Sequence, residues 1–547
     1  MIEPRPWLAL YPSNVPDALP VPNTNALAQF ASQASERPES PCIQYLGSEF
    51  SFAEIDSESD SFACGLAHSG FGVGDRCGLY IQNIPQFLIA VLGTWKAGGI
   101  AVPISPMLRQ RELAFELEDS ACRVLVCDSD LYDEVVRPVL ASSSVIVTLV
   151  TNGHDYEFGI PSRSEEPLPA GAHSFIALVR SHDGSRPAPV DITPESVAYL
   201  VYTSGTTGPP KAAMCLHGAV ALQGRVLGTW MNLGPQDTIL CGAPLFHVTG
   251  LIAGVATSHA VGAPMVLFGR FDAGRCLEMI ERWHASFTVM AITAFIALLN
   301  HPDVHFRDIS SLQKAYSGGA PISAATVSAW RRTTGVTIHG IYGLTETTSP
   351  SHAVPFGVDA PIDPVSGTLA VGVPLPNVYS WVSDIDTGHA LEPGQVGEIA
   401  IRGPMVVPGY WNQPEASAAT IVNGVLFTGD IGKQDVTGWL FVIDRKKDQI
   451  NASGYKVWPR EVEDVLYEHS GVREAAVLGV ADAYRGETVV AYISLRQDAI
   501  VSPDEIVKFC RDRLASYKCP REVKILSELP KTPTGKILKR KLRAVDD

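Results

Sequence analysis

The residues best suited to bind an anion form the ten-residue segment YTSGTTGPPK, which runs from Tyr202 to Lys211. Its two glycines allow backbone conformations that turn successive N–H groups toward an anion. Its hydroxyl groups can donate to phosphate oxygens, and Lys211 adds a positive charge. A polar surface turn is the general alternative for such a composition. The residues expected to hold phosphate are Thr203, Ser204, Gly205, Thr206, Thr207, Gly208 and Lys211.

This segment does not fit the phosphate loop of P-loop nucleotidases, whose motif ends in glycine, lysine and then serine or threonine. Lys211 follows a proline and precedes an alanine. A second candidate, TPTGK, ends at Lys536 and fails the same motif, because Pro530 replaces the first glycine and Ile537 follows the lysine. Neither segment is therefore predicted to be a P-loop.

The segments that must position these residues alternate between strand and helix patterns from residue 25 to residue 291. Short apolar runs predict buried strands at 76–81, 123–127, 196–202, 239–241, 263–268 and 287–291. Helices are predicted at 25–34, 86–97 and 109–119, and loops at 159–169 and 181–194. Strands that alternate with helices favour a mostly parallel α/β sheet.

From residue 367 the pattern changes to short strands and turns, which predicts a small β subdomain. Its strand segments read YSWVSD, GEIAIRG, VLFTGD and GWLFVID. Beyond the charged run RKKDQ, helices are predicted at 459–469 and 503–514, and strands at 474–480, 488–495 and 523–526. These later elements predict a separate α+β domain of roughly 100 residues.

The composition is that of a globular protein, with 46% hydrophobic and 18% charged residues among 547, and this length predicts two or more domains. The formal charge of −16 argues against non-specific nucleic-acid binding. The N-terminal segment lacks the features of a signal peptide, and no run of 18 apolar residues predicts a membrane span. The ten cysteines include no C-x-x-C pair, so we expect free buried thiols and a cytoplasmic location.

The segment YTSGTTGPPK resembles the phosphate-loop signature of the adenylate-forming superfamily. Acyl-CoA synthetases, adenylation domains of peptide synthetases and beetle luciferases belong to this superfamily. Its other signatures follow in order along nearly the whole chain, as KAGGIAVPISP (96–106), PLFHVTGL (244–251), YSGGAPIS (316–323), YGLTETT (342–348), GEIAIRG (397–403), FTGDIG (427–432), DRKKDQINASGYKV (444–457) and PKTPTGK (530–536). So many matches in one order are far more specific than any single motif.

The resemblance implies an α/β fold with two domains. A large N-terminal domain, at 1–446, would combine layered α/β subdomains with a small β subdomain and bind ATP and the acid. A small mobile α+β domain, at 447–547, would carry the catalytic lysine and line a thiol tunnel. By motif position the hinge is Lys447. Relatives rotate the small domain between two half-reactions, adenylation and thioester formation.

In the first half-reaction a carboxylate attacks the α-phosphate of ATP and pyrophosphate leaves, so ATP and Mg²⁺ are the expected cofactors. Glu346 resembles the Mg²⁺ ligand, and the hydroxyl of Thr207 matches one near the same ion. Asp430 matches the residue that accepts from the ribose hydroxyls, and Arg445 a second ribose or phosphate contact. The segments expected against adenine contain Gly318, Gly319, Ala320, Pro321, Tyr342, Gly343, Leu344 and Thr345, with Tyr342 stacked on the ring.

Lys536 matches the catalytic lysine that bridges the substrate carboxylate and the α-phosphate. A solvated lysine in a basic tail is the alternative. His247 matches a catalytic-site histidine near the reacting carboxylate, although a lone histidine in an apolar run is more often structural. The acid pocket is expected to contain His247, Val248, Thr249, Ser317 and Ile341.

The second half-reaction passes the acyl group to a thiol, which the resemblance implies is that of coenzyme A (CoA). The residues that match CoA contacts are Gly454, Tyr455, Arg485 and Arg521. Asn451 stands where many relatives have a lysine thought to help this step. An adenylation enzyme that loads the pantetheine of a carrier protein is an alternative. An inactive acyl-binding protein is another, although Glu346, Asp430 and Lys536 are all present. A luciferase-like oxygenation also stays open.

Two features give conflicting indications of the acid. The N-terminal PWLALYPSNVP resembles bacterial long-chain fatty-acid ligases, which favours an aliphatic acid and a role in fatty-acid metabolism. Ile341 replaces the glycine that many fatty-acid ligases have at this position, as in ligases resembling those for chlorobenzoate. A larger side chain at the pocket wall favours aromatic or shorter acids, unless it points into the core. The sequence leaves the acid and the oligomeric state open.

Overall fold

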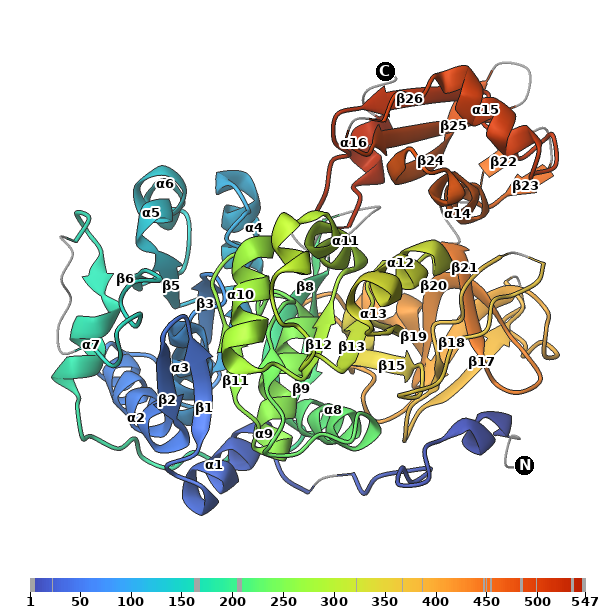
Figure 1. Cartoon of the computed structure of the whole chain (residues 1–547). Helices are drawn as coiled ribbons and strands as arrows, with labels where there is room; N and C mark the ends of the chain where they lie inside the picture. The colour runs from blue at the N-terminus through green and yellow to red at the C-terminus, as the bar shows by residue number, and fades with distance from the viewer. Residues whose placement is uncertain are drawn as a thin grey trace.

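The computed structural model describes most of the chain, namely residues 5–21, 23–161, 168–203, 209–320, 322–365, 367–385, 387–445, 448, 450–452, 455–482, 486–497, 499–532 and 536–543. Figure 1 shows a large body that contains the N-terminal and central elements and a smaller body, drawn in red, that holds the C-terminal elements. The α/β fold with a large and a small domain is confirmed. The boundary predicted between residues 446 and 447, and the hinge Lys447, lie outside the described residues and stay predictions.

A seven-stranded sheet has the order β7-β6-β5-β3-β4-β8-β9. All its neighbouring strands are parallel except β8 and β9, which form an antiparallel pair. Its strands are β3 (Arg76–Tyr80), β4 (Ile100–Pro103), β5 (Val124–Asp128), β6 (Val147–Thr151), β7 (His173–Ser174), β8 (Val197–Thr203) and β9 (Lys211–Leu216).

A nine-stranded sheet has the order β16-β15-β14-β13-β12-β10-β11-β1-β2 and is parallel from β14 to β1. Its strands are β1 (Pro41–Tyr45), β2 (Ser48–Ser51), β10 (Ile239–Leu240), β11 (Met265–Leu267), β12 (Phe287–Met290), β13 (Lys314–Ser317), β14 (Ile338–Leu344), β15 (Ser349–Ala353) and β16 (Val373–Pro374). The two sheets confirm the predicted mostly parallel arrangement.

The helices of the large body cover these two sheets (Figure 1). The α-helices are α1 (Ala26–Glu36), α2 (Phe52–His68), α3 (Pro85–Lys96), α4 (Gln110–Ser120), α5 (Ser129–Leu131), α6 (Arg137–Leu140), α7 (Phe175–Ser181), α8 (His217–Trp230), α9 (Thr257–Val261), α10 (Ala273–Trp283), α11 (Ile292–Asn300), α12 (Ala324–Thr334) and α13 (Pro414–Thr420). Shorter helices are η1 (Pro6–Leu10), η2 (Tyr132–Val136), η3 (Gly250–Ala256), η4 (Pro302–His305) and η5 (Thr345–Thr347), of which η2 and η3 are π-helices.

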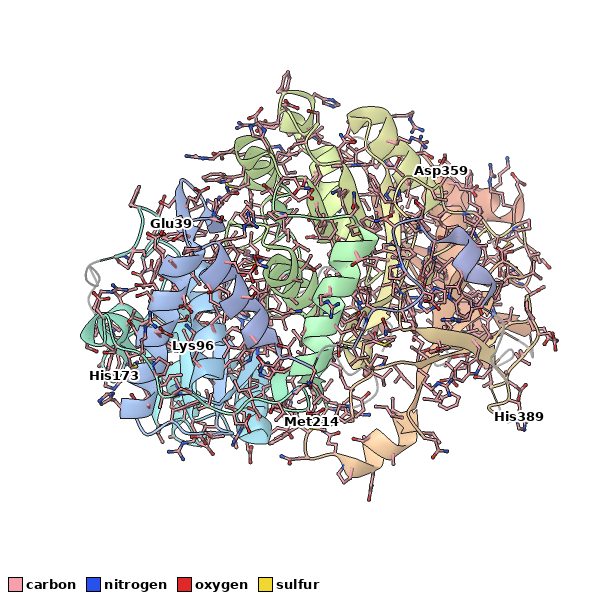
Figure 2. The ribbon with its side chains drawn as sticks, turned by 90° about the horizontal axis from the view of Figure 1, so that it is seen from below. Glu39, Lys96, His173, Met214, Asp359 and His389 are labelled. Carbon is pink, nitrogen blue, oxygen red and sulfur yellow. The ribbon has the colours of Figure 1, made fainter. Side chains whose placement is uncertain are left out.

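Helix α3 is buried along its whole length, and its last residue, Lys96, is a buried cation. The Lys96 amine lies 2.6 Å from a carboxylate oxygen of Asp56 and 2.6 Å from one of Asp60, both on α2. Figure 2 shows Lys96 among the helices on this side of the molecule. Because paired carboxylates offset the cost of burying a cation, this part of the KAGG signature joins two core helices.

The predicted β subdomain forms a five-stranded antiparallel sheet of β17 (Tyr379–Ser383), β18 (Gly397–Arg402), β19 (Ile421–Val422), β20 (Val425–Gln434) and β21 (Leu440–Arg445). The N-terminal arm binds beside it. The Tyr11 hydroxyl donates to the carbonyl of Pro374 at 2.6 Å, and the Leu19 N–H donates to the Asn377 side chain at 2.9 Å. The arm therefore contacts β16 of the nine-stranded sheet and the segment that leads into β17.

The small body is an α+β unit around a second five-stranded sheet. Its elements are β22 (Ile450–Ala452), β23 (Tyr455–Val457), α14 (Pro459–Glu468), β24 (Val472–Asp482), β25 (Gly486–Leu495), α15 (Pro503–Arg511), β26 (Glu522–Leu526) and α16 (Lys539–Arg543). In Figure 1, α14 lies on the side that faces the large body, and β26 lies on the far side. The predicted helices and strands of this unit are confirmed, with ends shifted by up to three residues.

The ten cysteines are all described as free thiols, and Cys64 is the one that is partly exposed. Within the described residues, none of the helices combines the length and the apolar character needed to cross a membrane.

Candidate active site

Glu346 lies in a tight turn that joins β14 to β15 through η5. A Cβ atom at Gly343 would lie 2.5 Å from the Ser349 carbonyl oxygen, so the close approach of the two strands requires glycine there. Two residues of the turn, Thr348 and Ser349, have left-handed φ angles of 47° and 74°. Such conformations persist where the surroundings hold them in place.

A buried glutamine of α8 holds this turn. The Gln223 amide donates to the carbonyls of Thr347, Thr348 and Pro350 at 2.8 to 3.1 Å. The N–H of Val407 donates to the Glu346 carbonyl at 2.9 Å. The backbone that carries the Glu346 carboxylate is therefore fixed from two directions.

Tyr410 connects Glu346 with the candidate phosphate loop. Its hydroxyl donates to Glu346 Oε1 at 2.6 Å, and burial, followed by the Glu346 charge, raises its pKa well above the usual range. The Lys211 amine lies 5.0 Å from the centroid of the Tyr410 ring, within the range of a cation–π contact. Thr203, at the end of β8, pairs with Lys211 at the start of β9. The tip between them, Ser204, Gly205, Thr206, Thr207 and Gly208, lies outside the described residues.

The setting of Glu346 suits Mg²⁺. Its carboxylate is half-buried and bonded on one oxygen, and the described residues form no cluster of three or more His, Cys, Asp or Glu side chains that could hold a metal ion. Mg²⁺ is commonly bound by one or two carboxylates together with substrate phosphates and water, so a lone carboxylate fits it. The predicted metal role of Glu346 stays a prediction, and Thr207 is not described.

Tyr342 and Asp430 meet on another side of the site. The Tyr342 hydroxyl donates to Asp430 Oδ2 at 2.8 Å, and the Asp430 side chain is buried in β20. Arg445 is the register partner of Asp430 on β21, although its side chain is not described. An ionised carboxylate accepts at about four lone-pair positions. Asp430 can therefore accept the Tyr342 hydroxyl and further hydroxyls together.

The loop after β13 lies where the two bodies meet. Gly319 has a φ of 75°, and a Cβ atom there would lie 3.3 Å from Lys536 Cε and 3.9 Å from its amine. Gly318 leaves room for Ile341, whose carbonyl oxygen a Cβ would approach to 2.5 Å. The adjoining Ala320 is described, and Pro321 is not. The structure therefore brings Lys536 of the small body to the segment predicted against adenine.

His247 lies close enough to Lys536 for the two to interact electrostatically. Burial, followed by the positive charge of Lys536, lowers the pKa of the imidazole to about 3. The Thr249 N–H donates to His247 Nδ1 at 3.2 Å. Because Nδ1 is thereby an acceptor, the neutral ring carries its proton on Nε2, which is free of that bond and can donate.

The predicted acid-pocket residues divide between two faces of the nine-stranded sheet. Ile341 is buried on the same side of β14 as His339, whose ring stacks on Tyr316 of β13. Thr249 lines a small cavity, and Val248 is buried in the core next to it. Because side chains alternate along a strand, Ser317 faces away from Tyr316, and its buried hydroxyl has no hydrogen-bond partner among the described residues. Ile341 and Ser317 therefore lie on opposite faces of this sheet, and Thr249 lines a cavity whose lining includes neither of them.

The expected CoA contacts are less fully described. Gly454 and Arg485 lie outside the described residues, and for Tyr455 only the backbone in β23 is described. Arg521 is exposed just before β26. The structure does not bring Arg521 together with Glu346 or Asp430.

Two profiles of known families match the chain. The profile described as AMP-binding enzyme matches residues 30–411, which is more than half of the chain, and the AMP-binding enzyme C-terminal domain matches residues 461–536. The chain belongs to the AMP-binding enzyme family. The expected membership of the adenylate-forming superfamily is confirmed.

Relatives in this AMP-binding enzyme family align over nearly the whole chain. A long-chain-fatty-acid–CoA ligase of Bacillus subtilis is 34% identical and covers 98% of the chain and 97% of its own length. A fatty acid–[acyl-carrier-protein] ligase of Streptomyces coeruleorubidus is 31% identical, with 96% and 98% coverage. The crystal structure of an anthranilate CoA ligase in complex with anthranoyl-AMP has a TM-score of 0.85, 27% identity and coverage of 96% and 98%. These likenesses support adenylate-forming acyl-CoA ligase activity.

Two residues of this AMP-binding enzyme that contact the Glu346 turn were not found from the sequence. Tyr410 follows GEIAIRG by several residues, in a stretch that reads VVPGYWN, and Gln223 lies in the buried helix α8. The glycine and the aromatic pair in that stretch were the available signal for Tyr410. No pattern in the sequence distinguishes Gln223 from an ordinary helical glutamine.

Proposed function

We propose that the chain joins a carboxylic acid to CoA through an acyl-AMP intermediate. The observation that supports this most directly is the position of Lys536, a residue of the small body, beside Gly319 and near His247 of the large body. The large body also holds Glu346, Tyr342 and Asp430. Adenylation brings two anions together, so a cation at their meeting point lowers its barrier. Lys536 is in a position to supply that cation from the small domain.

In the first half-reaction an oxygen of the substrate carboxylate forms a bond to the α-phosphorus of ATP, and the bond from that phosphorus to the pyrophosphate oxygen breaks. Asp430 accepts from the ribose, Tyr342 lies against the base, and Lys536 lies between the carboxylate and the α-phosphate. The His247 Nε2–H donates toward the reacting carboxylate. Bound Mg²⁺ supplies charge neutralisation on the phosphates, and Glu346 is the carboxylate that would hold it.

In the second half-reaction the thiol sulfur of CoA forms a bond to the acyl carbon, AMP leaves, and the thiol proton is lost to the surroundings. We retain the family's rotation of the small domain about Lys447 for this step, with Gly454, Tyr455, Arg485 and Arg521 as the CoA contacts. The cytoplasmic location and the domain boundary at residues 446 and 447 stay predictions as well.

For the acid we propose a fatty or aryl acid with an apolar acyl group. The small cavity beside Thr249 is lined by residues of β10, β12 and η3 with short side chains, including Gly250, Ala253 and Gly254. Val289 on β12 adds an apolar wall. Ile341 lies on the matching face of β14 and narrows the space next to Gly318. Such an apolar lining favours an apolar acyl group over a charged one, and the cavity, of about 10 Å³, must widen to admit it.

The test is a pyrophosphate-release screen with ATP and Mg²⁺ over fatty acids of several lengths, aromatic acids and dicarboxylic acids. We expect release that depends on an apolar acid, and acyl-CoA when CoA is added. Acid-dependent pyrophosphate release with no thioester would refute the CoA step. Release that needs no acid would refute adenylation itself.

A second candidate is the loading of a carrier protein, which the 31% identity to a fatty acid–[acyl-carrier-protein] ligase favours. The reacting thiol is a pantetheine in both cases. Supplying CoA and a pantetheine-bearing acyl carrier protein in competition separates the two. We expect the larger kcat/KM with CoA, and a larger value with the carrier protein would select the alternative.

A further inference from the structure

Two residues of the small domain contact the loop that follows β13. Lys536 lies beside Gly319, as described above. Three residues along the same loop, the carbonyl oxygen of Ile322 accepts a hydrogen bond of 3.2 Å from Arg460 Nη2. The loop that is predicted to lie against adenine is therefore contacted at both ends by side chains from the other domain.

Arg460 is buried, with 7% of its surface exposed, and it makes three kinds of contact at once. Its Nε lies 2.9 Å from both carboxylate oxygens of Asp464, one turn along α14. Its backbone N–H donates to Asp444 Oδ2 at 3.0 Å. Asp444 lies in β21 of the large body, so its carboxylate caps the first turn of α14 from the other side of the predicted hinge.

This capping fits the chemistry of the helix end. The N-cap residue of α14, Trp458, makes no side-chain capping bond. The first N–H groups of a helix need an acceptor, and the helix dipole favours a negative charge there. Asp444 provides both, and Arg460 adds a bond from its side chain to the large domain. Helix α14 is thus docked through its first turn.

Helix α14 also holds the segment that carries Lys536. Glu463 of α14 lies 2.8 Å from the amine of Lys539, three residues after Lys536. The same segment is closed by Thr532, whose hydroxyl accepts the Lys536 N–H at 3.0 Å. A series of contacts therefore connects Arg460, through α14 and Lys539, with Lys536.

We propose that Arg460 is a positioning residue for adenylation, because its bond to the Ile322 carbonyl holds the small domain in the orientation that places Lys536 at the site. The proposal rests on the proposed function. Arg460 itself touches neither acid nor nucleotide in this account. A planar guanidinium can donate to Asp464 and to Ile322 in fixed directions together, whereas an ammonium group on a shorter reach cannot. Rotation of the small domain must break the bond to Ile322, since the two partners belong to different domains.

The test measures the two half-reactions separately in the full-length Arg460→Lys variant. Acyl-AMP formation is followed by pyrophosphate release, and thioester formation is followed from supplied acyl-AMP and CoA. We expect acyl-AMP formation to fall by about 10-fold, the effect of losing one well-placed hydrogen bond to a charged group. Thioester formation should stay the same or become faster, because that step does not need the docked orientation.

The matched control is Asp464→Asn, which alters the same buried pair but keeps the donor for Ile322. It should leave the ratio of the two half-reactions unchanged. Should Arg460→Lys prove unstable by thermal denaturation, the double variant Arg460→Gln with Asp464→Asn replaces the ion pair by two amides and carries the same expectation. A uniform slowing of both half-reactions by the Arg460 variants, or no change in either, would overturn the proposal.

A Lys536→Ala comparator separates this inference from the function on which it rests. Loss of acyl-AMP formation in Lys536→Ala with normal formation in Arg460→Lys overturns the positioning role and leaves the proposed function standing. Normal acyl-AMP formation in Lys536→Ala overturns the role of the lysine itself.

Discussion

The carboxylate of Glu346 and the amine of Lys536, which we propose act on the same substrate, are held in different ways. The Glu346 turn is anchored by strands on both sides, by three bonds from Gln223 and by the Tyr410 hydroxyl. Lys536 lies on a short segment of the small domain and reaches Gly319 from outside the large body. From this difference we propose a site with one permanent side, on the large body, and one side that the small domain can withdraw. Such a division suits an enzyme that uses one site for two reactions in turn.

Glu346→Gln should give the largest effect on the permanent side. It keeps an acceptor for Tyr410 but removes the negative charge, so acyl-AMP formation should fall at least about 100-fold, or about 3 kcal/mol. The apparent half-saturation for Mg²⁺ should rise, which an Mg²⁺ titration of pyrophosphate release measures. Glu415→Gln, at an exposed position of α13, is the control and should be neutral. An unchanged Mg²⁺ dependence in Glu346→Gln would remove Glu346 from the metal site.

Ile341→Gly asks whether the permanent side also selects the acid. The glycine would open space next to Gly318, so kcat/KM for long or bulky acids should rise relative to short ones by ~10–200-fold, equivalent to ~1–3 kcal/mol of pocket fit. Ile341→Val removes one methyl group and should shift the profile in the same direction by less. An unchanged chain-length profile in both variants would show that Ile341 belongs only to the core.

Tyr410→Phe tests the link between Glu346 and Lys211 with a smaller change. The ring under Lys211 is kept and the 2.6 Å bond to Glu346 is lost. A hydrogen bond to a charged group contributes about 1.5 kcal/mol, so the half-saturation for Mg²⁺ should rise by about 10-fold. Tyr379→Phe, in the β subdomain, is the control. A Tyr410→Phe enzyme with normal Mg²⁺ dependence would mean that the Glu346 carboxylate is positioned without this bond.

Titration of the Glu116 carboxyl group should affect the folding stability of the large body and leave the rates of both half-reactions unchanged. Burial, followed by the charges of Glu112 and Asp119, raises its pKa from 4.5 to about 8. The folded state then binds more protons than the unfolded state between these values, so this group makes stability fall as pH rises through that window. Glu116→Gln should flatten the fall, which urea midpoints at several pH values measure. The control Glu118→Gln, at an exposed position, should leave the pH dependence of stability unchanged. If stability fell with pH by the same slope in both variants, the expected titration of Glu116 would be contradicted.

In the two large sheets the sequence predicted β3, β5, β8, β10, β11 and β12, because short apolar runs between turns are a strong local pattern, whereas neighbours such as β1, β6, β13 and β14 were not predicted. Helix α3 was found for the same reason, whereas α8 was missed. Its sequence, HGAVALQGRVLGTW, contains three glycines and is buried on nearly every side, so it has no polar face to reveal it.

Some residues of the candidate site could be predicted from the sequence, and others could not. Glu346, Asp430 and Lys536 lie inside recognisable signatures, so resemblance was enough to find them. Tyr410 and Arg460 act through contacts with segments more than 60 residues away in the chain, at Glu346 and Ile322. Neither contact follows from local spacing, because it depends on how strands and domains pack. The face to which Ser317 points was likewise set by the register of β13 with its neighbours.

The most direct measurement of the division between the two sides is the rate of each half-reaction in Lys536→Ala. The rate of acyl-AMP formation from ATP and acid should fall, because losing a transition-state donor raises the activation free energy by about 3 kcal/mol or more. Acyl-CoA formation from supplied acyl-AMP should continue at the wild-type rate, because by then the lysine has been withdrawn. Wild-type acyl-AMP formation, or an equal loss in both half-reactions, would contradict this account.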